Sequence, residues 1–104
     1  MVRGEVFRFR DPSGSRDSEQ GSRYVVVVQA DELLALSTVL ISPTSTEAPP
    51  RTFRPTIELG GPPTLILVEQ TMAVSPNRLG ACAGRLSAGE LHDLDTALAL
   101  VLGL

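Results

Sequence analysis

The chain has 104 residues, which suits one domain, and its formal net charge is −3. An acidic balance excludes the broad positive surface that grips duplex nucleic acid, so any contact with nucleic acid has to be local. The single cysteine, Cys82, excludes an internal disulfide and a multi-thiolate metal cluster, and we expect it to be a small buried apolar residue.

The sequence contains neither an export signal nor a membrane span. Residues 1–10 (MVRGEVFRFR) alternate charges with aromatic side chains instead of forming the apolar stretch of a signal peptide. The longest apolar run, residues 97–104, is far shorter than the ~18–20 residues that cross a bilayer. We therefore expect a cytoplasmic protein, without a membrane contact, whose residues 1–104 form a single domain.

The first half of the chain predicts strands separated by polar loops. In GEVFRFR, Phe7 and Phe9 fall on one face with the period of two that a half-buried strand has. The β-branched run YVVVVQ predicts a central strand that is covered on both faces. The predicted elements are a strand at 4–10, a loop at 11–22, a strand at 24–29, a helical turn at 31–35 and a strand at 38–42.

The second half predicts shorter strands and one closing helix. Pro55 interrupts its strand early, which favours a place at the sheet edge. Ser87 and Glu90 have the spacing of a capping box, and an apolar stripe at helical spacing follows them. The predicted elements are a proline-rich loop at 47–51, strands at 53–59, 64–70, 71–75 and 81–86, a helical turn at 76–80 and a helix after Ser87 with Leu91, Leu94, Leu98 and Val101 on one face.

These elements predict a mainly β fold: a small, strongly bent sheet or barrel with one helix. The sequence lacks the motifs of several enzyme classes. There is no G-x-x-x-x-G-K phosphate loop, no H-E-x-x-H and no C-x-x-C. His92, the only histidine, lies early in the predicted helix and is typical of a partly solvated helix residue.

One hydrolytic chemistry remains compatible with these side chains, namely cleavage of RNA by its own 2′-hydroxyl. The substrate then supplies the nucleophile, and the protein positions the strand and stabilises charge on the phosphate. Arginine offers a planar fork that suits phosphate. All nine basic residues are arginines, and Arg23 stands directly before the valine run. Five arginines lie in the first 23 positions: Arg3, Arg8, Arg10, Arg16 and Arg23.

Short motifs in the same order along nearly the whole chain resemble the MazF/PemK toxin endoribonucleases. The motifs are Gly4–Phe7, Ser18–Gly21 followed by Arg23 and the valines, Thr38–Ser45, Leu67–Gln70, Arg78–Gly80 and Gly84–Ser87. The resemblance implies an SH3-like barrel of the CcdB/MazF/PemK toxin fold with a C-terminal α-helix. It also implies a homodimer, a cognate antitoxin, and cleavage of single-stranded RNA without metal or cofactor that leaves 2′,3′-cyclic phosphate and 5′-hydroxyl ends.

The resemblance also assigns site residues. The family's catalytic arginine falls on Arg23, and its catalytic threonine falls on Ser45 if Pro43 is aligned with the family's proline. A slip of one position would select Thr44 or Thr46 instead. We expect Arg23 to stabilise the phosphorane, Ser45 to orient or relay a proton, and Glu19 to be a candidate base. The expected RNA-binding residues are Ser18, Gln20, Thr44, Thr46 and Gln70.

The chain departs from the family pattern at several positions, which leaves other functions open. Tyr24 stands where a proline is common, and Thr71, Met72, Ala81 and Cys82 stand where isoleucine or basic residues are common. The lost arginines indicate a different RNA sequence preference or reduced activity. One alternative is a CcdB-like protein that binds and poisons gyrase, and another is a catalytically silent relative that retains only antitoxin binding.

Overall fold

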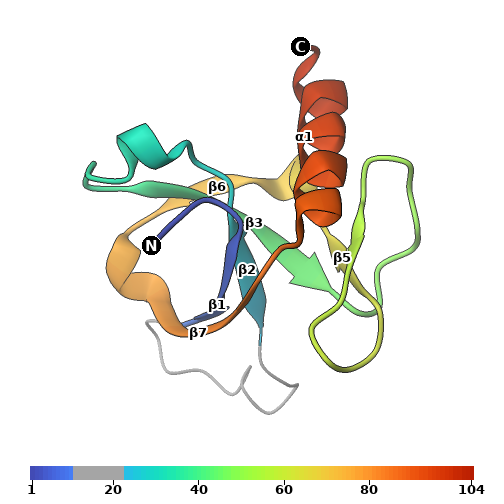
Figure 1. The fold of residues 1–104 in the computed structure, drawn as a ribbon, viewed down its shortest axis with the longest axis horizontal. Helices are drawn as coiled ribbons and strands as arrows, with labels where there is room; N and C mark the ends of the chain where they lie inside the picture. Colours follow the sequence, from blue (N-terminus) through green and yellow to red (C-terminus); the bar gives the residue numbers. More distant parts are fainter. Residues whose placement is uncertain (11–22) are drawn as a thin grey trace.

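The computed structural model describes residues 1–10 and 23–104 (Figure 1). It confirms the mainly β class with one C-terminal helix. The elements are β1 (Glu5–Phe9), β2 (Tyr24–Val27), the 3-10 turn η2 (Asp31–Leu33), β3 (Val39–Ser45), β4 (Thr56–Ile57), β5 (Thr64–Ile66), the 3-10 turn η3 (Val68–Gln70), β6 (Met72–Val74), the 3-10 turn η4 (Pro76–Arg78), β7 (Leu79–Arg85) and α1 (Ala88–Leu102).

The strands form one antiparallel sheet in the order β4-β5-β3-β2-β1-β7, and β6 also pairs with β3. Over the described residues the two ends of this order, β4 and β7, do not pair, so the sheet is a curled half-barrel. Helix α1 follows β7 and packs Leu94 and Ala97 into the apolar cluster on one side of the sheet. Its far end stands clear of the sheet in Figure 1.

Strand β2 lies at the centre of the hydrophobic core, as the valine run predicts. Alternate valines point to opposite faces: Val26 and Val28 belong to one buried cluster, and Val25 and Val27 belong to the other. Each of these side chains is at most 8% exposed. The prediction of a central strand covered on both faces is therefore confirmed.

Strand β1 is more deeply packed than the sequence pattern predicts. Phe7 and Phe9 are partly buried against one cluster, whereas Val6, on the opposite face, is fully buried in the other. Only Arg8 and Arg10 on that face are exposed. Both faces of the strand meet apolar side chains because the helix covers the end that carries Val6, so the prediction of a half-buried strand is wrong there.

Strand β3 extends through Pro43 to Ser45, beyond the predicted end at residue 42. The Pro43 carbonyl accepts the Leu67 N–H at 2.8 Å, which joins β3 to the chain ahead of η3. The extension has a consequence for the site, because Thr44 and Ser45 become consecutive strand residues whose side chains alternate in direction.

Two predicted strands are shorter than expected. The predicted 53–59 strand retains only β4, at the sheet edge that Pro55 indicated. The predicted 64–70 strand divides into β5 and the turn η3, where Gln70 N–H bonds to the Leu67 carbonyl at 2.9 Å. Local 3-10 hydrogen bonds therefore replace sheet pairing over residues 68–70.

The expectation that Cys82 is buried is wrong. Cys82 lies in the middle of β7 and is exposed. Strand β7 pairs with β1 on one side and is the last strand of the described sheet, so its outer side chains are not covered by another described strand. The strand also begins at Leu79, so Gly80 lies inside it and does not end the preceding turn in the predicted way.

Helix α1 begins with the predicted capping box. Ser87 Oγ accepts from the Glu90 N–H at 3.1 Å, and Glu90 Oε1 accepts from the Ser87 N–H at 2.9 Å. The helix ends at Gly103, whose φ of 74° suits a residue without a β-carbon. No helix of the described residues is long and apolar enough to cross a membrane.

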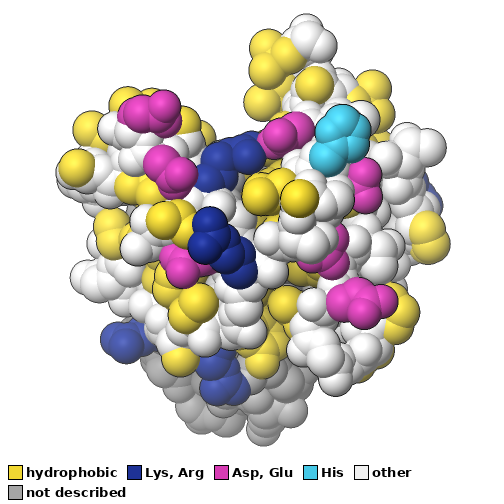
Figure 2. All heavy atoms as spheres, viewed as in Figure 1, with side chains coloured by type: hydrophobic (Ala, Val, Ile, Leu, Met, Phe, Trp, Pro, Cys, Tyr) yellow, Lys and Arg dark blue, Asp and Glu magenta, His cyan; other side chains and the backbone are white. Residues whose placement is uncertain are grey.

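The free end of α1 is apolar and uncovered. Leu100, Leu102 and Leu104 are exposed there, and Figure 2 shows hydrophobic side chains gathered at this tip. On the same face, basic and acidic side chains are interspersed (Figure 2), so it carries no continuous belt of one charge.

Leu94 anchors the helix to the sheet, and its truncation is expected to destabilise the protein strongly. Its side chain is fully buried among Val6, Ile57 and Ile66. Leu94→Ala should lower the free energy of unfolding by about 2–5 kcal/mol, because it removes buried methyl groups and leaves a cavity. Urea unfolding measures the loss, with exposed His92→Ala on the same helix expected within about 0.5 kcal/mol of wild type. Equal stabilities of the two variants would contradict this packing.

Candidate active site

A cleft with a volume of about 610 Å³ opens where β2 begins and β3 ends. Four segments that are distant in the sequence line it. They are residues 23–24 at the start of β2, residues 43–47 at the end of β3, residues 59–64 between β4 and β5, and the chain around η3 with Leu67 and Gln70. The cleft brings together five of the predicted site residues, namely Arg23, Thr44, Ser45, Thr46 and Gln70.

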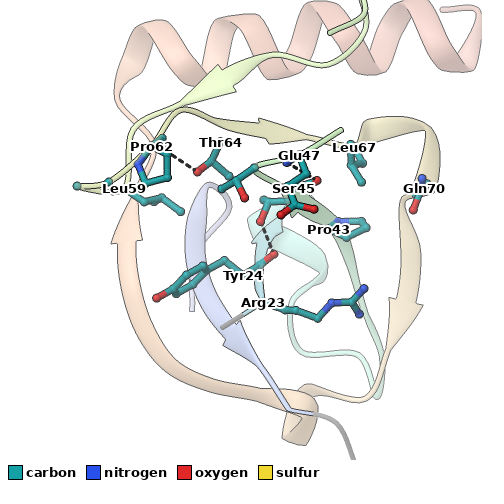
Figure 3. Close-up of a pocket in the computed structure, with 14 residues that line it drawn as sticks. Arg23, Tyr24, Pro43, Ser45, Glu47, Leu59, Pro62, Thr64, Leu67 and Gln70 are labelled. Carbon is teal, nitrogen blue, oxygen red and sulfur yellow. Dashed lines mark hydrogen bonds between the residues drawn. The ribbon is translucent and has the colours of Figure 1, made fainter. Parts of the chain in front are cut away.

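Arg23 lies at the mouth of the cleft and its side chain is exposed. Its backbone carbonyl accepts from the Phe9 N–H at 2.9 Å, which ties this residue to the core strands. Within residues 1–10 and 23–104, Arg23 makes no ion pair. In Figure 3 its guanidinium extends toward the side of Gln70, whereas the neighbouring Tyr24 ring extends toward Leu59. The guanidinium is thus presented to the cleft by a rigid strand.

Ser45 ends β3 and forms the first residue of a tight turn. Its Oγ accepts from two backbone N–H groups, that of Glu47 at 3.0 Å and that of Ala48 at 2.9 Å. A hydroxyl has one proton and two lone pairs, so these contacts occupy both acceptor positions. Within residues 1–10 and 23–104 the Ser45 hydroxyl donates no hydrogen bond, so its proton can be donated to a molecule bound in the cleft that Ser45 lines.

The neighbouring hydroxyls are placed differently. Thr44 Oγ1 donates to the Tyr24 carbonyl at 2.8 Å, so its proton is already used inside the protein. Thr46 lines the cleft and is exposed. Of the three hydroxyls at 44–46, Ser45 is therefore the one that is both fixed by the turn and able to donate.

The opposite wall of the cleft is apolar and open. Tyr24 is partly buried against the core cluster and also lines the cleft beside Leu59. Gly60, with a φ of 87°, adopts a conformation that favours glycine. A β-carbon added at Gly60 or Gly61 would meet no atom within 4 Å, so the rim has free space above it. This wall suits the flat face of a nucleobase.

The wall at η3 is held by an ion pair outside the cleft lining. Arg54 donates to Glu69 Oε2 through Nη2 at 2.6 Å and through Nε at 3.1 Å. Gln70, which lines the cleft, also donates to Glu69 Oε2 at 3.5 Å. The hydrogen bond from Arg54 holds the pKa of Glu69 below its ordinary value of 4.5, although partial burial acts in the opposite direction.

The lowered pKa of Glu69 predicts a pH dependence of stability. A carboxylate with a depressed pKa in the folded state stabilises the fold above its unfolded pKa, and this contribution is lost as the pH falls through the folded pKa. Glu69→Gln should therefore cost about 0.5–1 kcal/mol at pH 7, and the difference from wild type should be smaller at pH 3. Urea unfolding at both pH values measures this, and a pH-independent difference would contradict the charge-based account.

Three predicted site residues, Ser18, Glu19 and Gln20, lie outside the described residues. The sequence analysis did not identify two further residues of the site region, Glu47 and Arg54. Glu47 is the only carboxylate among the described residues that line the cleft, and its place two residues after Ser45 was the available signal. Arg54 had no signal, because only the fold brings it to Glu69.

Three other N-terminal arginines that the structure describes, Arg3, Arg8 and Arg10, do not line the cleft. Arg3 instead forms an ion pair with Asp95 at 2.8 Å and donates through Nε to the Val28 carbonyl, so it fastens the helix to the sheet. Arg8 and Arg10 are exposed but are not among the residues that line the cleft. Across the described ranges, no group of three or more His, Cys, Asp and Glu side chains could hold a metal ion.

Comparisons with known proteins agree with this architecture. Residues 2–102 match the model of the PemK-like, MazF-like toxins of type II toxin–antitoxin systems. A Mycobacterium tuberculosis protein named as a candidate toxin, Rv3098A, is 34% identical over 106 residues, covering 100% of this chain and 99% of the relative. The fold and cleft are thus those of a small toxin. The chain belongs to the PemK-like, MazF-like toxin family.

Solved structures share the fold at low sequence identity. A mycobacterial endoribonuclease solved with its cognate antitoxin has a TM-score of 0.81 and 18% identity, covering 100% of this chain and 96% of that one. The M. tuberculosis toxin MazF-mt6 has a TM-score of 0.79 and 15% identity, covering 96% and 97%. The predicted toxin fold is therefore confirmed.

Proposed function

We propose that this toxin is a metal-independent endoribonuclease that cleaves single-stranded RNA, including messenger RNA, at short sequences. The observation that carries the proposal is the placement of Arg23 and Ser45 in one cleft, where Arg23 makes no ion pair within the described residues and the Ser45 hydroxyl can donate. The presence of both side chains in one cleft suits cleavage of RNA by its own 2′-hydroxyl, the chemistry expected from the sequence. The RNA supplies the nucleophile, and the protein supplies donors for the phosphate.

The reaction proceeds by attack of the 2′-oxygen on the adjacent phosphorus. A bond forms between the 2′-oxygen and phosphorus, and the bond from phosphorus to the 5′-oxygen breaks. The proton of the 2′-hydroxyl passes to a base, and the departing 5′-oxygen receives a proton. The products are a 2′,3′-cyclic phosphate and a 5′-hydroxyl end, and DNA is not cleaved because it lacks the 2′-hydroxyl.

Arg23 and Ser45 act as donors in this scheme. Guanidinium stays protonated at neutral pH, so Arg23 binds the phosphoryl oxygens through charge-assisted hydrogen bonds. Ser45 has both lone pairs engaged by backbone N–H groups, which makes it a donor to the phosphate or to the leaving oxygen and not a base. The base is a carboxylate. Glu19 is the candidate from the sequence, and Glu47 is a second candidate because it lines the cleft.

RNA bases are bound along the rest of the cleft. Thr44, Thr46 and Gln70 offer hydrogen-bonding groups. Ser18 and Gln20, which lie outside the described residues, are further candidates from the sequence alone. Tyr24 offers an aromatic face on the opposite wall. The loss of family arginines beyond this cleft supports a recognition sequence unlike that of relatives.

The proposed partners are a second copy of the chain and a cognate antitoxin in the cytoplasm. The exposed leucines at the end of α1 leave apolar area for such a contact. One structural neighbour was solved with its cognate antitoxin, which supports the same arrangement here.

The test is incubation of purified protein with a long RNA in the presence of a chelator, followed by mapping of the cut ends. We expect cuts at a short recurring sequence with cyclic phosphate ends, and no cuts in DNA of the same sequence. Cleavage that requires a divalent metal would contradict the mechanism. Intact RNA together with binding to gyrase would favour the CcdB-like alternative, and intact RNA with antitoxin binding alone would favour the silent relative.

A further inference from the structure

Two walls of the cleft are formed by segments that do not pair with each other as strands. One is the turn that follows β3, where Ser45 Oγ holds the N–H groups of Glu47 and Ala48. The other is η3, which presents Gln70. Strand β3 pairs with β5, with Ser45 opposite Leu65, and the Pro43 carbonyl accepts the Leu67 N–H, so these contacts place the strands. The position of the turn against η3 depends on further contacts.

Arg54 bridges these two walls. Its Nη1 donates to the Pro49 carbonyl at 2.9 Å, at the end of the turn that Ser45 begins. Its Nη2 and Nε donate to Glu69 Oε2 at 2.6 and 3.1 Å. The Arg54 side chain is only 14% exposed, and that of Glu69 is 26% exposed. One planar group therefore holds a carbonyl of one wall and a carboxylate of the other.

The contacts form a continuous path from one cleft group to the other. It runs from Ser45 Oγ through the turn to Pro49, then through Arg54 to Glu69, and from Glu69 Oε2 to the Gln70 side-chain amide. Arg54 is not among the residues that line the cleft, so it does not stand where RNA would bind. Its role is indirect.

We infer that Arg54 is a positioning residue for RNA cleavage, which sets the Ser45 turn and Gln70 at their working separation. The inference rests on the proposed function. A displacement of about 1 Å in a donor can cost about 100-fold in rate, so a residue outside the cleft can control the chemical step. Lysine cannot replace it, because an ammonium lacks the fork that serves two acceptors in fixed directions.

The experiment compares Arg54→Met and Arg54→Lys with a matched control, Arg51→Met. Arg51 lies in the same loop and is exposed, and among the described residues its side chain donates only to the carbonyl of its neighbour Pro50. We expect kcat for RNA cleavage to fall about 10- to 100-fold in both Arg54 variants, with KM changed less than about threefold. Arg51→Met should cleave like wild type.

A second measurement does not depend on catalysis. Backbone order parameters of Glu47 and Ala48, from nitrogen-15 relaxation, should fall from about 0.85 in the wild type to below about 0.6 in Arg54→Met. Arg51→Met should leave them unchanged. If Arg54→Met failed to fold, Arg54→Lys would carry both measurements.

The possible outcomes separate the two proposals. Arg54 variants with wild-type kcat, or with an unchanged turn in the relaxation data, would overturn the positioning role. A rise in KM alone would instead indicate direct RNA binding by Arg54 and would also overturn it. If the wild type cuts no RNA, the proposed function fails, and the order parameters still decide whether Arg54 holds the turn.

Discussion

Arg23→Lys is expected to slow RNA cleavage by about 10²- to 10³-fold, the usual cost of losing a well-placed donor to a developing oxyanion. Lysine preserves the charge at the mouth of the cleft but cannot form two parallel hydrogen bonds to phosphate. Because Arg23 is exposed and makes no ion pair within the described residues, the free energy of unfolding should change by less than about 0.5 kcal/mol. Single-turnover rates on a defined RNA measure the effect.

The matched control for Arg23 is Arg85→Lys. Arg85 is exposed at the end of β7 and is not among the residues that line the cleft. It should cleave at the wild-type rate. If Arg23→Ala cut a good substrate within a few-fold of wild type, the donor role of Arg23 and the proposed mechanism would both be wrong.

Ser45→Ala is expected to reduce kcat about 100-fold, because it removes the hydroxyl that donates to the phosphate or the leaving oxygen. It also frees the Glu47 and Ala48 N–H groups, which should cost about 1 kcal/mol of stability. Ser45→Thr retains a hydroxyl at the same position and should keep most of the activity. Cleavage rates of the two variants, measured beside their unfolding free energies, separate the chemical effect from the structural one.

Thr44→Val separates the role of the Thr44 hydroxyl from that of the Ser45 hydroxyl. Its hydroxyl proton already bonds to the Tyr24 carbonyl, so its loss should lower stability by about 1 kcal/mol but leave kcat within several-fold of wild type. If Thr44→Val lost most of its kcat while Ser45→Ala stayed nearly active, the catalytic hydroxyl would be that of Thr44 and not that of Ser45.

The fold was readable from the sequence where patterns are strong and local. The valine run identified β2 because a strand covered on both faces has no polar alternation. Ser87 and Glu90 fixed the start of α1 because both capping contacts lie within one turn. Arg23 was predicted as a site residue because it stands directly before the valine run and matches the family's arginine, and it lines the cleft.

Features that depend on distant segments were not readable. Strand β3 continues through Pro43, whose carbonyl accepts the Leu67 N–H, and no local signal indicates this contact between distant segments. Cys82 is exposed because β7 is the last strand in the described sheet, and strand order is a property of the whole fold. The contact of Arg54 with Glu69 joins residues 15 positions apart across two turns. Ser18, Glu19 and Gln20 remain predictions.

The open rim at Gly60 and Gly61 bears on how this toxin could diversify. A β-carbon at Gly61 would meet no atom within 4 Å, so a small side chain there should leave the fold intact while narrowing the entrance of the cleft. Sequence preference could therefore drift through substitutions at this lip without any change in the strands that hold the reacting groups. If the proposed RNA cleavage is correct, a small library at this one position should yield toxins with altered RNA sequence preference.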